Sequence, residues 1–395
     1  MNKDYEKISF LLIVPYTIPQ YSGSGLNAFN FARFLSREGI KVTLLSFNRN
    51  MKLLRKEWID NVFIRRILYF NQNLVYKILS LIFIIPLYIA YIFKNKIILI
   101  YGGHIIGYEI IILITKWLDK KIIFQSLLID ADDVETIINN KPKFLSDFYK
   151  RLFNRIDIYH SINSNFTKRF REILGETNTI LEMPQGVDIS VFKTVSDEMR
   201  FLAKNQLCIP EKSYVLFSVG FMIPRKGFSG LFDALKNLNI PYIYIIAGEF
   251  DFPKGHFLYQ YSNSASELVK KGKRLLGDKL ILAGPVRDIQ KYYNAADVVI
   301  FSSVQEGLPN SLLEAMSCGI PVVTKDIPGL EGLILRNGEN CLIFNDGNEL
   351  KDHIHYLYKN RDIATKIGFT AIREIQQKAS FQIVLSSYYQ RLFMT

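Results

Sequence analysis

The sequence predicts an α/β protein built from two doubly wound domains, each around a parallel sheet. Its 395 residues suffice for roughly two domains. Short apolar runs fall into two sets, and most of them end in glycine, serine or a turn before a helix-length segment. The first set is ISFLLIVP, VTLLSF, KIILIYGG, KIIFQSLL, DIYHSI and NTILEMP, and the second is YVLFSVG, YIYIIAG, KLILAG, DVVIFSS, IPVVTKD and NCLIF.

The junction between the domains is expected in the polar stretch between Phe192 and Pro210. We assign residues 1–195 to an N-terminal domain, residues 196–380 to a C-terminal domain and residues 381–395 to a final amphipathic helix. The N-terminal run is short and leads directly into a proline and a glycine loop, so it is predicted to be the first strand rather than a signal peptide.

Three cysteines, Cys208, Cys318 and Cys341, are scattered along the chain. Their spacing matches neither a metal site nor a disulfide framework, so a reduced, cytoplasmic setting is expected.

The segment from Asp297 to Asp326 contains the clearest candidates for ligand-binding residues. DVVIFSS is predicted to be a buried strand, followed by the loop QEGLPN, the helix SLLEAMS and a second buried strand in GIPVVTKD. Asn310 or Ser311 is expected to cap the helix. Such a strand, helix and strand unit binds its ligand at the carboxyl ends of the strands.

Two glutamates lie on either side of this helix start. Glu306, on the loop, can accept hydrogen bonds from hydroxyls, and Glu314, about one turn into the helix, can bind a vicinal diol. Backbone N–H groups beside them are predicted to bind an anion with the help of the helix dipole. These groups belong to Gly307, Asn310, Ser311 and Leu312. A diphosphate between two sugars suits this arrangement; the alternative is that both glutamates are merely solvated polar residues.

EGLPNSLLEAMSCGIPVV resembles the E-x7-E signature of family 4 glycosyltransferases, which are retaining enzymes with the GT-B fold. Five further segments resemble the family in its own order and are spread across nearly all of the chain. They are YSGSGLNAFNFARFLSREGIKVTLLSF, MPQGVDISVF, SVGFMIPRKGFSGLFDAL, IIAG and LAGPVRDIQKYYNAADVVIFSS. The resemblance implies two Rossmann-like domains with an interdomain cleft. It assigns acceptor binding to the N-terminal domain and nucleotide-sugar binding to the C-terminal domain, with the final helix packed back on the first.

The resemblance implies a hexosyltransferase that moves a sugar from a nucleotide diphosphate sugar, UDP-linked by family preference, to a hydroxyl. The acceptor would be a glycan or a lipid-linked glycan of bacterial surface polysaccharide, such as capsule or lipopolysaccharide. Three alternatives stay open: a nucleotide-sugar epimerase, a phosphorylase, and a non-catalytic scaffold that binds nucleotide sugar.

Arg225 and Lys226 follow the buried strand YVLFSVG and are candidate catalytic residues together with Glu306. A cation at this position can neutralise a departing diphosphate. Lys226 matches the family's loop lysine, whereas Phe221 stands where the family often has an arginine. Arg225 either substitutes for that charge or the site works with Lys226 alone. A solvated pair of loop cations is the alternative.

In the N-terminal domain, Gly23 and Gly25 allow a close backbone approach, and the helix after them offers its N-terminus to phosphate. A plain turn is the alternative for these glycines.

Candidates on the acceptor side are His104, Asp130, Asp132 and Asp133. Many relatives have a histidine after the strand that corresponds to KIIFQSLL, where this chain has the aspartates. One of them could contact acceptor hydroxyls or act as a base, and capping a following helix is the alternative for Asp132 or Asp133. DADD also suggests a divalent metal, but GT-B enzymes use basic side chains and helix ends, so no metal or other cofactor is expected.

The run from Ile78 to Phe93 is uncharged, shorter than the roughly 20 residues of a bilayer span, and interrupted by Pro86. Lys77, Lys94 and Lys96 flank it, and the chain carries a net charge of +12. An interfacial role on an anionic membrane surface, on the inner face of the cell membrane, is one hypothesis, and a pair of core helices is the other. Nucleic acid is not expected as a partner, because no RNA-binding signature or arginine-rich helix accompanies the charge.

Overall fold

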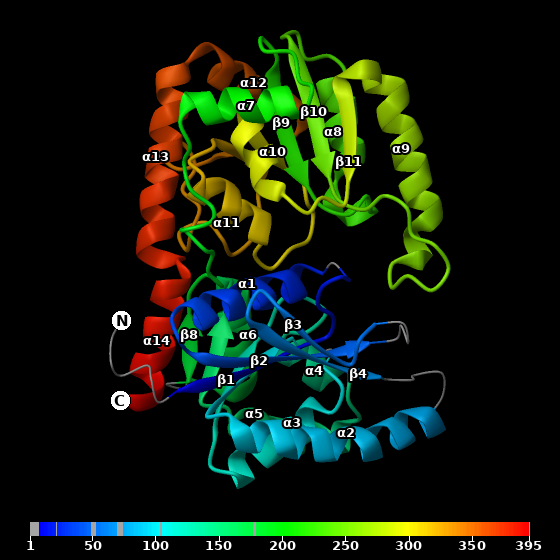
Figure 1. The fold of residues 1–395 in the computed structure, drawn as a ribbon, viewed down its shortest axis with the longest axis vertical. Coiled ribbons are helices and arrows are strands. Elements are labelled where there is room, and N and C mark those ends of the chain that lie inside the picture. The colour runs from blue at the N-terminus through cyan, green and yellow to red at the C-terminus, as the bar shows by residue number, and fades with distance from the viewer. Residues whose placement is uncertain are drawn as a thin grey trace. The chain divides into compact units, whose positions relative to one another are not determined.

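The computed structural model describes residues 8–20, 22–48, 53–68, 74–102, 105–176 and 179–394. The chain divides into two compact units (Figure 1). Unit 1 comprises Met1–Asp188 and Phe381–Thr395, and unit 2 comprises Ile189–Ser380. The division falls before the predicted junction because Phe192 already packs in unit 2. Its ring lies 5.9 Å from that of Tyr293, and its carbonyl accepts a hydrogen bond from the Ser317 hydroxyl.

Unit 1 contains an eight-stranded sheet in the order β3-β4-β2-β1-β5-β6-β7-β8. Its strands are β1 (Ser9–Val14), β2 (Lys41–Asn48), β3 (Lys56–Ile59), β4 (Val62–Leu68), β5 (Ile97–Tyr101), β6 (Lys121–Gln125), β7 (Ile158–Ser161) and β8 (Ile180–Glu182). All neighbours are parallel except the pair of β3 and β4. The six apolar runs of the first set form β1, β2 and β5 to β8.

The antiparallel pair of β3 and β4 was not among the predicted strands. These strands meet at Asp60 and Asn61, whose φ angles are 48° and 62°. Two consecutive residues of positive φ form the kind of two-residue hairpin turn that Asp and Asn favour. The dipeptide Asp60–Asn61 lies between Trp58 and Phe63, which pair across the hairpin, and it is the sequence feature that could have predicted this turn.

Helices cover both faces of this sheet. They are α1 (Gly23–Arg37), α2 (Leu74–Lys94), α3 (Tyr108–Trp117), α4 (Val134–Asn139), α5 (Ser146–Phe153), α6 (Ser164–Leu174) and α14 (Phe381–Phe393). Within β6 the faces alternate, as pleating requires. Ile123 joins a core with α1 and α14, whereas the ring of Phe124 lies 5.4 Å from that of Phe153 in α5. Figure 1 shows α2, α3 and α5 together on one face of the sheet.

The final helix, α14, lies in unit 1. The ring of Phe381 at its start lies 5.1 Å from that of Phe31 in α1. Further along, the Tyr388 hydroxyl and His160 Nδ1 are 2.6 Å apart. Burial lowers the pKa of His160 to about 4, so this histidine is neutral and helps to anchor α14.

Unit 2 contains a six-stranded, fully parallel sheet in the order β11-β10-β9-β12-β13-β14. Its strands are β9 (Tyr214–Val219), β10 (Tyr242–Ala247), β11 (Leu280–Gly284), β12 (Val298–Phe301), β13 (Val322–Lys325) and β14 (Leu342–Phe344). They coincide with the second set of apolar runs. The order reverses between β9 and β12, which are neighbours in the sheet, and this switch point is where such folds bind ligands.

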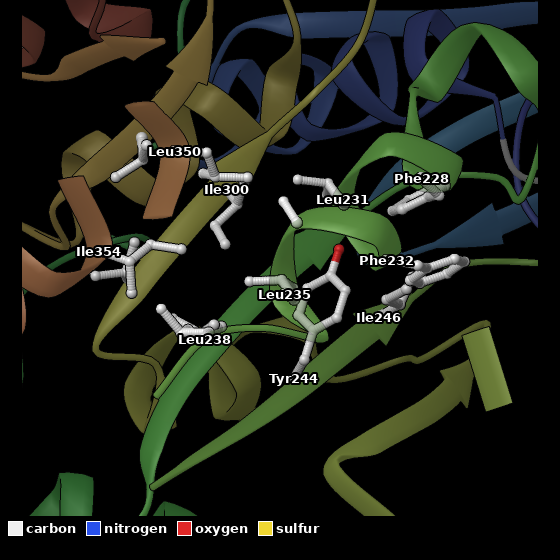
Figure 2. Close-up of a cluster of buried hydrophobic side chains, with 14 of the residues drawn as sticks. Phe228, Leu231, Phe232, Leu235, Leu238, Tyr244, Ile246, Ile300, Leu350 and Ile354 are labelled. Atoms are coloured by element: carbon white, nitrogen blue, oxygen red, sulfur yellow. The ribbon is translucent and has the colours of Figure 1, made fainter. Parts of the chain in front are cut away.

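The helices of unit 2 are α7 (Asp197–Gln206), α8 (Phe228–Leu235), α9 (Ser262–Leu276), α10 (Ile289–Ala295), α11 (Asn310–Ser317), α12 (Gly347–Lys359) and α13 (Arg361–Lys378). Figure 2 shows α8 in the core of this unit. Its buried side chains have the spacing of one helical face and pack with Ile246, Ile300 and Ile354. They are Phe228, Leu231, Phe232 and Leu235. This packing fixes the start of α8, which directly follows the candidate Arg225 and Lys226.

Helix α2 corrects one of the two alternatives for the apolar run from Ile78 to Phe93, the pair of core helices, and the interfacial role stays a prediction. It is one continuous helix that passes through Pro86, not a pair of core helices. One face of it is buried and another is exposed. Within the described parts of the chain, no helix has the length and apolar character that crossing a membrane requires.

Candidate donor site of unit 2

The candidate site lies at the switch point of the unit 2 sheet, where the loops after β9 and β12 meet. Pro224–Lys226 forms one turn of 3₁₀ helix directly before α8. The Val304 amide donates to the Arg225 carbonyl at 2.9 Å, and the Ser302 hydroxyl donates to the Lys226 carbonyl at 2.7 Å. Hydrogen bonds to their carbonyl groups therefore fix the backbone of the two basic residues against the end of β12.

Gly227 makes this close approach feasible. Its φ is +72°, and a Cβ at this position would lie 2.0 Å from the Ser302 carbonyl oxygen. No side chain fits at that distance, so the loop requires glycine for both conformation and space. Gly248 at the end of β10 is constrained in the same way, because its Cβ would lie 2.0 Å from the Gly220 carbonyl oxygen.

Glu306 forms an ion cluster with both basic residues. Its Oε1 lies 2.5 Å from Lys226 Nζ and 3.1 Å from the Arg225 guanidinium. Burial raises the pKa of Glu306, but the charges of Lys226 and Arg225 outweigh it, so its pKa lies below the usual value. The three predicted catalytic residues thus come together, with two positive charges against one negative charge. Arg225 takes part in the cluster directly.

Helix α11 begins beside this cluster without a side-chain cap. Its N-cap is Pro309, and no side chain caps it, so the prediction that Asn310 or Ser311 is the N-cap is wrong. Both residues lie inside the first turn instead, because proline with its extended backbone ends the preceding loop one residue earlier. Gly307 lies on the loop, Leu312 is buried, and the anion role of their backbone N–H groups stays a prediction.

Glu314 lies on the inner face of α11 and is only 6% exposed. Its Oε2 accepts a hydrogen bond of 2.8 Å from the Tyr293 hydroxyl of α10. Burial raises the pKa of Glu314 to about 7, against which the Tyr293 hydrogen bond works. The pKa values of the two glutamates of the E-x7-E pattern are therefore shifted in opposite directions, that of Glu306 downward by two cations and that of Glu314 upward by burial. The sequence pattern gave no sign of Tyr293, which lies 21 positions from its partner.

In unit 1, Gly25 serves the packing of its own backbone. Helix α1 starts at Gly23, and the Gly25 amide donates to the hydroxyl of the N-cap residue Ser22 at 3.1 Å. A Cβ on Gly25 would lie 1.9 Å from the carbonyl oxygen of Tyr16. The close approach predicted for a ligand is thus made by the chain itself, and phosphate binding at Gly23 and Gly25 stays a prediction.

The three candidate aspartates of unit 1 differ in exposure. Asp133 is fully buried and is the N-cap of α4, accepting from the Thr136 amide at 2.9 Å, which bears out the capping alternative. Asp132 is buried and accepts from two backbone amides of the loop before it. Asp130 is exposed and pairs with Arg169 at 2.7 Å. The acceptor-side prediction therefore depends on Asp130, while His104 lies outside the described residues.

Solved structures share this architecture along the whole chain. Sucrose-phosphate synthase from Thermosynechococcus elongatus superposes with a TM-score of 0.75 at 16% identity, covering 98% of this chain and 100% of that one. HepE of Anabaena in complex with UDP-glucose gives a TM-score of 0.72 at 18% identity, covering 98% and 100%. With its two parallel-sheet units, the protein has the GT-B fold.

Residues 199–373 match the model of the family "Glycosyl transferases group 1". The UDP-Gal:alpha-D-GlcNAc-diphosphoundecaprenol alpha-1,3-galactosyltransferase of Escherichia coli is 26% identical over 209 residues, which are 52% of this chain and 48% of the relative. The O-antigen chain mannosyltransferase B of Escherichia coli is 27% identical over 186 residues, 45% and 46% of the two chains. The match to this family model lies within unit 2, and the chain spans about half the length of these curated relatives.

Proposed function

We propose that the protein is a retaining glycosyltransferase that moves a sugar from a UDP-sugar to a hydroxyl of a lipid-linked glycan during bacterial surface polysaccharide synthesis. The observation that carries the proposal is the cluster of Arg225, Lys226 and Glu306 at the switch point of unit 2. The relative from Escherichia coli is named for UDP-Gal and a diphosphoundecaprenol acceptor, which supports both the donor and the lipid-linked acceptor.

The chemistry follows from the charges. As the bond from the sugar carbon to the diphosphate breaks, negative charge develops on the leaving phosphate. Lys226 and Arg225 are held by backbone hydrogen bonds, so they can stabilise this charge with little reorganisation. The N-terminus of α11 adds its dipole at the same edge of the sheet. We propose that these groups act in place of a metal ion.

Glu306 has two roles in this proposal. In the described state it holds Lys226 in position through the 2.5 Å ion pair. With donor bound, its lowered pKa keeps it a carboxylate that can accept hydrogen bonds from sugar hydroxyls. Because the diphosphate then engages Lys226, the ion pair loosens as the donor binds.

A panel of nucleotide sugars, incubated with the purified protein with and without a polyprenyl-diphosphate-linked sugar, tests the proposal. Transfer to the lipid-linked acceptor with retained configuration is the expected result. Conversion of the donor sugar without acceptor would indicate an epimerase, and release of sugar phosphate from added phosphate would indicate a phosphorylase. Donor binding without turnover on any acceptor would indicate a scaffold.

Glu314→Ala is expected to weaken UDP binding by a factor equivalent to roughly 1.5–3 kcal/mol, since hydrogen bonds to a charged group contribute that much. Binding of the ribose diol favours the ionised carboxylate, whose pKa is about 7 in the free protein. UDP binding near pH 6 should therefore release protons and weaken as the pH falls. Calorimetry in buffers of different ionisation enthalpy measures both effects.

Tyr293→Phe is the matched control, because it removes the hydroxyl that donates to Glu314 and leaves the carboxylate in place. If Glu314 merely packs α11 against α10, the two variants should weaken UDP binding equally and wild-type binding should release no protons. That outcome would remove Glu314 from the nucleotide site.

A further inference from the structure

Helix α2 is apolar on all sides, yet one of its faces is exposed. Ile84, Tyr88 and Ile92 follow one another at four-residue spacing and are fully buried. The opposite face carries exposed apolar residues through three turns without a charge. They are Ile82, Phe83, Pro86, Ile89, Ala90 and Phe93. A helix that is apolar all round is normally buried, so this exposed face needs an explanation beyond the core of unit 1.

The exposed apolar surface continues onto the neighbouring helices. Helix α3 packs against α2, where the Tyr88 hydroxyl donates to the Ile106 carbonyl at 2.6 Å, and α5 packs against α3. Leu113 and Trp117 of α3 are exposed one turn apart. Phe144, in the 3₁₀ turn Lys143–Leu145 directly before α5, and Phe148 of α5 are exposed at the same spacing.

We call the rings of Phe83, Phe93, Trp117 and Phe144 the aromatic face. They are 67 to 83% exposed. Among the other Phe and Trp residues that the structure describes, only Trp58 is more than 60% exposed. Figure 1 shows α2 and α3, which carry three of these rings, and α5, which directly follows the turn of Phe144, along one side of unit 1. Aromatic rings are therefore concentrated on this side and not scattered over the surface.

Positive charge surrounds the aromatic face. Residues 94–121 and 141–157 contain ten Lys or Arg and four Asp or Glu, and one of these acids, Asp157, pairs with Lys116 and Lys121. Lys94, Lys120 and Lys143 form no ion pair with another described residue. Lys120 Nζ lies 5.9 Å from the ring centroid of Phe93, so cation and ring stand side by side at the edge of the face.

We propose that the aromatic face docks unit 1 on the surface of an anionic bilayer. Its rings enter the boundary between headgroups and acyl chains, and the surrounding lysines contact anionic headgroups. Rings without charge would favour a protein partner, and charge without rings would favour a polyanion; their combination on one side of unit 1 fits a lipid surface. The inference rests on this surface alone and can hold or fail independently of sugar transfer.

Vesicle co-sedimentation tests the proposal. The wild-type protein should bind vesicles that contain phosphatidylglycerol more tightly than vesicles of phosphatidylcholine alone, and binding should weaken in high salt. Phe83→Asp should lower the partition coefficient roughly ten- to a hundredfold, the range expected when one buried Phe is lost from the interface. Lys94→Glu should reduce the preference for anionic vesicles.

Phe369→Asp is the matched control, because this phenylalanine of α13 is 59% exposed but lies outside the aromatic face. It should leave vesicle binding unchanged. UDP binding and circular dichroism show that the variants are folded, and Phe144→Asp replaces Phe83→Asp if the latter is not. Wild-type protein that ignores anionic vesicles at low salt overturns the proposal. A dimer that Phe83→Asp dissociates, without vesicle binding, would instead make this face a contact between two copies.

Discussion

Lys226→Ala is expected to lower kcat about a hundred- to a thousandfold while KM for the donor changes only a few-fold. This is the loss seen when one preorganised donor to a developing anion is removed. The ammonium group lies 2.5 Å from Glu306 and is held at a fixed loop, so it can meet charge that grows on the leaving diphosphate. Charge stabilisation is greatest in the transition state, and the loss should therefore fall on kcat.

Two control variants separate the catalytic role of Lys226 from an effect of the substitution on folding stability or positioning. Lys236→Ala removes an exposed lysine after α8 and should leave kcat unchanged. Glu306→Gln removes the ion-pair partner but keeps Lys226, so it distinguishes the cation's own contribution from its positioning. If Lys226→Ala raises KM and leaves kcat as it was, Lys226 contributes to ground-state binding alone.

The sheet strands could be predicted largely because buried parallel strands are short, continuous apolar runs that end at a turn. The strands β3 and β4 were not predicted because they lack such a continuous apolar run. In VFIRRIL buried and part-exposed positions alternate and two arginines interrupt the run. Arg66 is nevertheless buried, because it pairs with Glu57 of β3 at 2.7 Å and donates to the Ile18 carbonyl.

The candidate site could be predicted in part. Lys226 and Glu306 lie 80 positions apart in sequence, but each follows the carboxyl end of a strand, so the topology of parallel strands predicts that they lie close together. Burial of a given side chain does not follow. Phe83 and Ile84 are adjacent in an apolar run, yet one is exposed and the other fully buried, because the helix turns them to different sides. Asp132 and Asp133 were likewise ambiguous, since both accept from backbone amides of a loop whose path depends on the tertiary fold.

Glu314→Gln is expected to stabilise unit 2 at pH 8 by about 3 kcal/mol and to have little effect at pH 4. In the folded protein burial raises the pKa of Glu314 from 4.5 to about 7. Between these values the folded state holds a proton that the unfolded state has released, so stability falls as the pH rises through this window. Above pH 7 the full cost of a buried charge is present. Glutamine is neutral at every pH and can still accept from the Tyr293 hydroxyl.

Thermal unfolding at a series of pH values measures the effect. For a unit of this size about 3 kcal/mol corresponds to a rise in Tm of roughly 6–12 °C at pH 8. Calorimetry is the suitable method, because both tryptophans, Trp58 and Trp117, belong to unit 1. The difference between wild type and variant isolates Glu314 from other groups that titrate in the same range.

Glu306→Gln is the internal control, because the two glutamates should respond to pH with opposite signs. The pKa of Glu306 is lowered by Lys226 and Arg225 despite burial. Its contribution to stability is therefore present above its unfolded pKa and lost as the pH falls through the folded value. At pH 8 Glu306→Gln should destabilise unit 2, whereas Glu314→Gln stabilises it. Equal Tm shifts for Glu314→Gln at pH 4 and pH 8 would mean that Glu314 titrates as an ordinary solvated carboxylate. The side chain would then have to reach solvent, and its pairing with Tyr293 could not be its main state.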